Sequence, residues 1–222
     1  DMLLTGLDWK YFNWQQMEFH QQLNLLKTGI VFADAVSTVS PTYAREIQRS
    51  PGGCGLEGLL ASRAAELTGI VNGIDTAAWN PATDPHIPRT YGESDVADGK
   101  YAARVALAAR LGHAAPAARP LVAFVSRLAA QKGVELVVEL IGRLAGTGRV
   151  QFVVLGTGDG AHEEALRRAA AAFPGAVDVV IGFDEPLAHL VQAAADITLV
   201  PSLYEPCGLT QLYAQRYGAI PV

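Results

Sequence analysis

The sequence of 222 residues has few cysteines, no excess of basic residues and no long apolar run. Its two cysteines, Cys54 and Cys207, lie far apart without the spacing of metal ligands, so neither a disulfide framework nor a zinc site is predicted. Seventeen Lys and Arg against 22 Asp and Glu give a formal net charge of -5, which argues against binding nucleic acid or anionic membranes through a broad basic surface. No apolar run approaches the roughly 18 residues of a membrane span. We therefore expect a protein of the reducing cytoplasm with no nucleic-acid or membrane partner, while its oligomeric state is not addressed by the sequence.

What the sequence does contain is typical of a globular protein. Half of its residues (50%) are hydrophobic and 18% are charged, so the chain can bury a sizeable core and is not intrinsically disordered. The start at Asp1 resembles neither a signal peptide nor a natural initiation site, and the last residues, 218–222, resemble the beginning of a buried strand. We expect an internal fragment of a longer protein.

The first part of the chain has short and irregular patterns. Apolar spacing predicts a helix through four positions, Phe19, Leu23, Leu26 and Ile30. A strand is predicted over 35–40, a helix start at Ser40 and Pro41, and a glycine-rich loop over 49–58. Residues 80–99 are rich in Pro, Asp and Thr, the composition of a linker or surface segment. We therefore assign 1–80 to the end of an N-terminal domain, 81–119 to a linker and connecting helix, and 120–222 to a C-terminal domain that is incomplete at its C-terminus.

From residue 100 onward, helices and buried strands alternate regularly. The predicted strands are 120–126, 151–156, 177–182, 196–202 and 219–222. The predicted helices cover 100–111, the apolar face from Val134 to Leu144, the segments through Leu166 and Leu187, and a segment from about Leu209. Continuous apolar strands of this kind are covered on both faces. The fold class predicted is α/β, a doubly wound, Rossmann-like parallel sheet, in which ligands bind at the carboxyl ends of the strands.

Two cations follow the first of these strands. Arg127 and Lys132 lie five positions apart at the ligand edge, where they could neutralise a diphosphate without a metal, or could simply be solvated side chains at a helix start. After the second strand, Gly156 and Gly158 could let backbone approach a ligand, although the dinucleotide fingerprint is incomplete. A tight structural turn capped by Asp159 is the simpler interpretation of that segment.

The segment 201–218 is the most informative. Glu205 follows the fourth strand, and backbone N–H groups around Gly208, Leu209 and Thr210 form a helix N-terminus, which suits phosphate. A carboxylate beside a phosphate site would be repelled by the phosphate, so sugar hydroxyls are the better binding partner for Glu205. The alternative is that Glu205 only caps a turn. Cys207 has no nearby His in sequence, so a packed loop residue is a better interpretation than a nucleophile.

Four motifs in order support a family resemblance. They are VSPTYAREI (39–47), GIVNGIDTAAWNPATD (69–84), VSRLAAQKG (125–133) and EPCGLTQLYAQRYG (205–218). Together they resemble bacterial glycogen synthases and plant starch synthases, retaining glucosyltransferases of the GT-B type with two Rossmann-like domains. The resemblance runs from about Asp34 to the last residue. It implies transfer of glucose from the donor ADP-glucose to the non-reducing end of an α-1,4-glucan acceptor, with no cofactor and no metal.

The resemblance also implies roles for individual residues. Arg127 and Lys132 match the pair on the donor diphosphate, and Glu205 matches the acidic residue on the glucosyl group. Asn72 matches an Asn near the donor glucose, and Phe183 matches an aromatic residue that stacks on adenine. The loop and helix start that hold the sugar and distal phosphate are matched by Cys207, Gly208, Leu209 and Thr210. Tyr213 stands where the wider superfamily has a second Glu, as it does in this family.

Two functional segments of the resembled enzymes have no counterpart in this sequence. These are a Lys-x-Gly-Gly loop and a His close to the reacting sugar, so we do not expect a complete active site from these residues alone. Two alternatives stay open: a GT-B glycosyltransferase that uses a UDP- or GDP-sugar, and a non-catalytic nucleotide- or glucan-binding protein.

Overall fold

The computed structural model describes residues 2–116 and 118–222, and their contacts divide the chain into two compact units, one up to Asn72 and one from Gly73. This division precedes the predicted boundary at residue 80. Residues 73–80 and the described part of 81–119 belong to the second unit.

The first unit consists of short elements around a small core. Its elements are η1 (Met2–Thr5), η2 (Trp9–Tyr11), β1 (Glu18–Phe19), β2 (Gln22–Leu23), α1 (Leu25–Phe32), β3 (Val36–Thr38), α2 (Pro41–Glu46), α3 (Glu57–Ser62) and β4 (Leu67–Gly69). Strands β3 and β4 pair in parallel, while β1 and β2 form an antiparallel hairpin. The buried side chains of Ile30, Leu56 and Leu60 form the core.

The predicted helix through Phe19 and Leu23 is wrong at its beginning. The backbone turns at His20 and Gln21, which both have positive φ, and Phe19 and Leu23 lie in the hairpin strands. The helix starts only at Leu25, where the Asn24 side chain accepts a hydrogen bond from the Lys27 N–H. The helix start at Ser40 and Pro41 is confirmed, because the Ser40 side chain caps α2 through the Tyr43 N–H.

A five-stranded parallel sheet organises the second unit, which confirms the predicted fold class. Its strands are β5 (Leu121–Val125), β6 (Gln151–Gly156), β7 (Val177–Ile181), β8 (Ile197–Thr198) and β9 (Ile220–Pro221), in the order β7-β6-β5-β8-β9. Five helices accompany them: α4 (Val96–Arg110), α5 (Val134–Leu144), α6 (Gly160–Ala172), α7 (Glu185–Ala194) and α8 (Leu209–Arg216). The strand order reverses at β5, which pairs with both β6 and β8. An α/β sheet binds its ligands at such a reversal.

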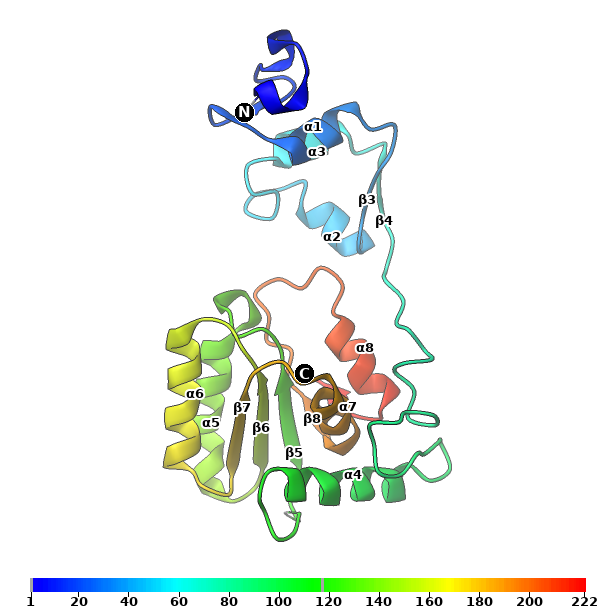
Figure 1. Cartoon of the computed structure of the whole chain (residues 1–222), viewed down its shortest axis with the longest axis vertical. Helices are drawn as coiled ribbons and strands as arrows, with labels where there is room; N and C mark the ends of the chain where they lie inside the picture. The colour runs from blue at the N-terminus through cyan, green and yellow to red at the C-terminus, as the bar shows by residue number, and fades with distance from the viewer. Residues whose placement is uncertain (1, 117) are drawn as a thin grey trace. The chain divides into compact units, whose positions relative to one another are not determined.

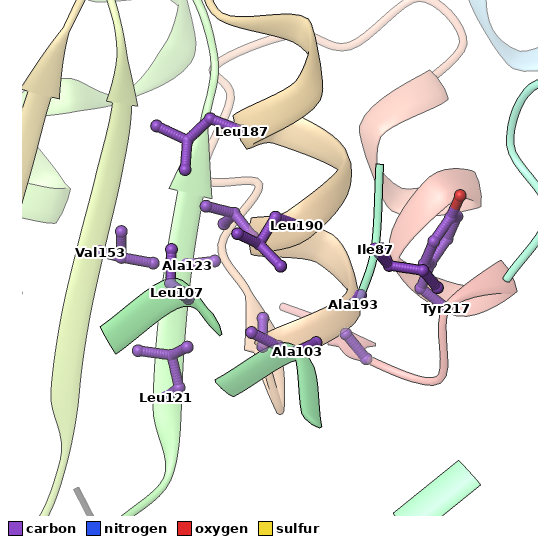
Figure 2. Packing of buried hydrophobic residues seen from close by; sticks show 14 of the residues in the cluster. Ile87, Ala103, Leu107, Leu121, Ala123, Val153, Leu187, Leu190, Ala193 and Tyr217 are labelled. Carbon is purple, nitrogen blue, oxygen red and sulfur yellow. The ribbon is translucent and has the colours of Figure 1, made fainter. Parts of the chain in front are cut away.

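Alternate side chains of the central strands face two different hydrophobic layers. Leu121 and Ala123 join one cluster, which includes residues of α4, α7 and α8, and Figure 2 shows part of this cluster, with Leu107 of α4 and Leu187 of α7. Val122 and Phe124 join a second cluster, formed with α5 and α6. In Figure 1, α5 and α6 lie together on one side of the sheet, α7 lies on the other, and α4 runs across the lower ends of the strands. Burial on both faces explains why these strands are continuous apolar runs.

Most of residues 80–99 are exposed, as their composition predicted, but a few buried side chains anchor the segment. Asp84, Ile87 and Tyr91 are buried, and the Tyr91 hydroxyl donates to the Tyr217 carbonyl oxygen at 2.9 Å. Helix α4 begins at Val96, earlier than predicted. No helix in the described ranges is long and apolar enough to cross a membrane.

Asp84 anchors this segment to α7 and α8. Its Oδ2 lies 2.7 Å from Nδ1 of His189 and accepts a hydrogen bond from the Tyr217 hydroxyl, while its Oδ1 accepts from the His86 N–H at 2.8 Å. Burial disfavours the charged carboxylate, but the hydrogen bonds from Tyr217, His86 and His189 outweigh that effect and lower the pKa of Asp84.

We expect Asp84→Asn to lower the free energy of unfolding at neutral pH by about 3 kcal/mol, because it removes one member of a buried polar network. A depressed pKa in the folded state means that the carboxylate stabilises the fold above its ordinary pKa of about 4. This contribution is lost as the pH falls through the lower folded-state value. Urea unfolding between pH 3 and 7 should therefore show a difference between wild type and variant that shrinks below about pH 4.

Asp98→Asn is the matched control. Asp98 pairs with Arg89 at 3.2 Å but its side chain is 67% exposed, so we expect a loss below about 1 kcal/mol. Equal losses for the two variants would contradict the anchoring role of Asp84.

Candidate functional site

The candidate site lies where the loops after β5 and β8 meet, at the carboxyl edge of the sheet. Lys132, in the short helix η3 (Ala130–Lys132), places its Nζ 2.6 Å from Oε2 of Glu205. The Ser202 hydroxyl donates to the same carboxylate oxygen at 2.8 Å. The Lys132 and Glu205 side chains are only 19% and 24% exposed, so the pair is largely removed from solvent.

The electrostatic surroundings keep Glu205 ionised. Partial burial disfavours its charge, but the Lys132 ammonium, the Ser202 hydroxyl and the Gly208 N–H together hold the pKa of Glu205 below its usual range. The carboxylate therefore carries its charge at neutral pH. It can accept hydrogen bonds from hydroxyl groups of a ligand but cannot donate a proton.

Gln131 links the same two loops through two further contacts and makes a third within its own loop. Its carbonyl oxygen accepts from the Leu203 N–H at 2.9 Å, and its side-chain Nε2 donates to the Tyr204 carbonyl at 3.2 Å. Its Oε1 accepts a long hydrogen bond of 3.4 Å from Arg127. The contacts with Leu203 and Tyr204 therefore join the two loops beside the Lys132–Glu205 pair.

Gly133 allows the loops to approach this closely. It has a left-handed φ of 68°, and a Cβ at this position would lie 2.1 Å from the Pro201 carbonyl oxygen. Only glycine fits here without moving the backbone that leads to Glu205.

Arg127 occupies a different part of the edge from Lys132. Its side chain is exposed and lines a pocket of about 270 Å³ together with Gly156, Thr157 and Phe183. The structure therefore places the two predicted cations on one loop with Gln131 between them. Their action on one diphosphate remains a prediction.

Gly156, the last residue of β6, and Gly158, in the loop that follows, serve close packing between loops. A Cβ on Gly156 would lie 1.9 Å from the Ser126 carbonyl oxygen, and one on Gly158 would lie 2.3 Å from the Leu128 carbonyl oxygen. A backbone bridge also joins Leu128 and Gly158. These contacts hold the Arg127 loop against the loop after β6. Contact of either glycine with a ligand remains a prediction.

The predicted capping role of Asp159 is wrong. Asp159 precedes α6, but its side chain makes no capping hydrogen bond. Glu163 performs this role instead, because it accepts from the Gly158 N–H at 3.1 Å and from the Thr157 hydroxyl at 2.8 Å. A Glu in the first helical turn satisfies free N–H groups in the same way as a cap residue.

The loop after β8 leads into the N-terminus of α8. Gly208 precedes the helix with a left-handed φ of 78°, and Leu209 and Thr210 form the first helical positions. N–H groups at such positions lack partners within the helix and favour anions. Cys207 is half-buried and unpaired in the loop, in agreement with a packed loop residue.

Phe183 follows β7 with its ring 89% exposed. It lines the pocket of Arg127 and also a second pocket of about 200 Å³ that includes Trp79, Thr210 and Tyr213. An exposed ring at the edge of two pockets is available for stacking on a planar ligand.

Asn72, in contrast, is an exposed residue that ends the first unit, and its predicted donor contact stays a prediction.

Three residues of the site were not predicted from the sequence. Ser202 stands three positions before Glu205, a spacing at which its hydroxyl can donate a hydrogen bond to a carboxylate of the same loop. Gln131 lies within the quoted motif between the two cations, and only the contact between loops reveals its role. Trp79 lies within another quoted motif, and nothing in its spacing indicates that it lines a pocket with Phe183. Across residues 2–116 and 118–222, no three His, Cys, Asp or Glu side chains are grouped so that they could hold a metal ion.

Comparison with known proteins agrees with this geometry. The family model "Glycosyl transferases group 1" matches residues 109–222, which is more than half of the chain. The chain belongs to the group 1 glycosyl transferases. The model "Starch synthase catalytic domain" matches residues 1–62 of this glycosyl transferase.

Curated relatives extend the similarity over both units of this glycosyl transferase. The glycogen synthase of Anaeromyxobacter sp. (strain Fw109-5) is 54% identical over 98% of the chain, and that of Rhodospirillum rubrum is 51% identical over 99%. The chain spans 45% of the length of each of these relatives. The predicted resemblance to glycogen and starch synthases is confirmed at this level.

Solved structures agree with the fold. The catalytic domain of starch synthase IV from Arabidopsis thaliana, bound to ADP and acarbose, matches 97% of the chain and 45% of its own chain, with a TM-score of 0.90 and 39% identity. Anabaena HepE, in complex with UDP and glucose, has a TM-score of 0.58 over 89% of this chain and 46% of its own chain. At 19% identity, HepE supports the GT-B fold alone.

Gly156→Ala should destabilise this glycosyl transferase by about 1 to 3 kcal/mol, because the added methyl group overlaps the Ser126 carbonyl oxygen and forces the two loops apart. Gly160→Ala is the matched control, since a Cβ there meets nothing within 4 Å. In the first turn of α6 this control should be neutral or stabilising by up to about 1 kcal/mol. Urea unfolding measures both variants, and equal stability would contradict the packing role of Gly156.

Proposed function

We propose that this chain is the donor-binding part of an ADP-glucose-dependent glycogen or starch synthase. The whole enzyme would transfer glucose to the non-reducing end of an α-1,4-glucan and retain the configuration at the anomeric carbon. The observation that carries the proposal is the Lys132–Glu205 pair beside the N-terminus of α8, at the carboxyl edge of the sheet. The names of the curated relatives and the starch synthase IV structure support the same substrate class.

The proposed chemistry follows from the charges that develop on the sugar and the diphosphate during the reaction. In glycosyl transfer, positive charge develops on the sugar while negative charge builds on the departing diphosphate. Arg127, Lys132 and the first N–H groups of α8 would stabilise the diphosphate, so this charge balance needs no metal. The ionised Glu205 would accept hydrogen bonds from glucose hydroxyls and orient the sugar.

Retention of configuration constrains the direction of attack. None of the site residues is proposed as a nucleophile on the opposite face of the sugar. We therefore propose that the acceptor hydroxyl attacks from the same side as the leaving phosphate. A phosphate oxygen would accept the proton of that hydroxyl. The protein's residues would hold the leaving group and the sugar in place during this step.

ADP is proposed as the nucleotide on grounds of similarity. The starch synthase IV structure, bound to ADP, is 39% identical to this chain, whereas the HepE structure, bound to UDP, is 19% identical. A UDP- or GDP-sugar remains the second candidate because the diphosphate contacts do not read the base. A non-catalytic nucleotide- or glucan-binding protein would not need Arg127, Lys132 and Glu205 together. A cytoplasmic location is part of the proposal, based on the two unpaired cysteines.

Substitution of the cations tests the proposed catalysis in the full-length enzyme that contains this chain. We expect Lys132→Ala and Arg127→Ala each to lower kcat by about 100- to 1,000-fold, because the lost charge matters most as ADP departs. Arg143→Ala is the control, since Arg143 pairs only with Glu139 on the exposed side of α5. Incorporation of labelled glucose into glycogen gives kcat and KM. A near-normal kcat for both site variants would refute the diphosphate assignment.

Phe183→Ala should raise the KM for ADP-glucose by about 5- to 100-fold with a smaller change in kcat, because base stacking contributes about 1 to 3 kcal/mol. Tyr101→Ala is a matched control, as Tyr101 is a 63% exposed aromatic residue of α4. If both variants bind ADP as tightly as wild type in calorimetry, Phe183 does not stack on the base.

A further inference from the structure

A buried polar network lies behind the candidate site, and no step proposed above uses it. Asp84, His189 and Tyr217 are each at most 2% exposed. The Tyr217 hydroxyl lies 3.3 Å from Nδ1 of His189, and both groups contact the same oxygen of Asp84. The network therefore fixes the His189 ring of α7 between Asp84 and Tyr217, the residue that follows α8.

Trp79 stacks directly on this fixed ring. The indole lies 3.7 Å from the His189 ring on one face and 3.9 Å from the Tyr213 ring on the other, with interplanar angles of 13° in both cases. Tyr217 contacts the indole edge-on at 6.2 Å. His189, Trp79 and Tyr213 thus form a continuous stack of three rings, which we call the Trp79 stack.

The open end of the Trp79 stack is Tyr213, which lines the pocket of about 200 Å³ with Thr210 and Phe183. Tyr213 and Thr210 lie on α8, the helix whose N-terminus follows Glu205 and Gly208. Partial burial, together with the nearby Asp75 and Cys207, raises the pKa of the Tyr213 hydroxyl. The ring therefore lies beside the site loop as a neutral, flat surface.

Rigid stacking at this place has a consequence for α8. The helix has eight residues, and its first turn has no capping side chain. Short helices depend on tertiary contacts for their orientation. Stacking of Tyr213 on Trp79, with His189 behind it, restricts the rotation of α8 about its axis and so the direction of its N-terminal N–H groups.

We propose that Trp79 is a positioning residue for nucleotide binding, which acts through Tyr213 to orient α8 and the aromatic wall of the pocket that receives the nucleoside. This inference rests on the proposed function, because it takes the donor nucleotide as the ligand. Trp79 also lines this pocket beside Tyr213, so a direct contact with the nucleoside would appear as a further loss of affinity when Trp79→Leu is added to Tyr213→Leu.

The first test is ADP binding to the 222-residue chain by calorimetry. We expect Trp79→Leu to weaken ADP binding by at least fivefold and Trp79→Phe, which keeps an aromatic ring, by less than threefold. Trp14→Phe, at a 73% exposed position of the first unit, is the control and should bind as wild type does. In a Tyr213→Leu background, Trp79→Leu should have no further effect, because the residue acts through Tyr213.

A second measurement does not change Trp79. The sequence has three tryptophans, of which Trp9 and Trp14 lie in the first unit. With both replaced by Phe, the emission of Trp79 should shift or be quenched as ADP saturates the site. A role confined to stability predicts no fluorescence response and unchanged ADP affinity in the folded Trp79 variants. Either of these results would overturn the proposal.

Different results would contradict the proposed donor site and the positioning role of Trp79. If the folded wild-type chain does not bind ADP, the proposed donor site is wrong and this inference falls with it. If wild type binds ADP and Trp79→Leu binds equally well, only the positioning role is wrong. Should Trp79→Leu not fold, the Tyr213→Leu affinity and the Trp79 fluorescence decide. A normal affinity for Tyr213→Leu or an unresponsive Trp79 would then refute the role.

Discussion

The contact between Lys132 and Glu205 joins the two loops that leave strands β5 and β8, and the arrangement of the candidate site depends on it. These strands are adjacent and parallel, so their carboxyl ends bring the loops to the same edge. The charged side chains can remain partly buried because each has a partner and the carboxylate has a further hydrogen bond from Ser202. Removing either partner would leave an uncompensated charge, so the pair constrains which conformations of the two loops are stable.

Close backbone packing supports this ion pair. Gly133 lets the Lys132 loop contact Pro201, and Gly156 and Gly158 let the loop after β6 contact Ser126 and Leu128. Each of these glycines faces a carbonyl oxygen at a distance that excludes a Cβ. The site is therefore built on three loops that fix one another, and residues 79–84 are held against α8 and the residue that follows it by Asp84 and the Trp79 stack.

The regular α/β half was predictable because its strands are buried on both faces and its helices have one apolar face. The strand over 151–156 and the helix starts at Val134 and Leu209 agree with the structure to the residue. The hairpin around Phe19 was not predictable, because two positive-φ residues, His20 and Gln21, interrupt a spacing typical of a helix. The burial of Asp84 was not predictable either, because the segment around it is polar in composition. The free-energy cost of burying this carboxylate is offset by contacts with His189 and Tyr217, which are far away in sequence.

The same distinction applies to the site. Lys132 and Glu205 were identified from residue type and position after a strand, and the structure brings them to 2.6 Å. Ser202, Gln131 and Trp79 act through contacts between segments that no local pattern encodes. Asp159 was assigned a capping role because it directly precedes the helix, but Glu163, one turn later, makes the hydrogen bonds.

The most direct test of a donor site at this edge is the change in backbone amide resonances of the isotope-labelled chain on addition of ADP. The account predicts shifts in the loops after β5, β6 and β7 and at Gly208 to Thr210. It predicts no shifts around Gly148 and Gly175, which precede β6 and β7 at the opposite edge. Shifts confined to that opposite edge, or none at saturating ADP, would contradict it.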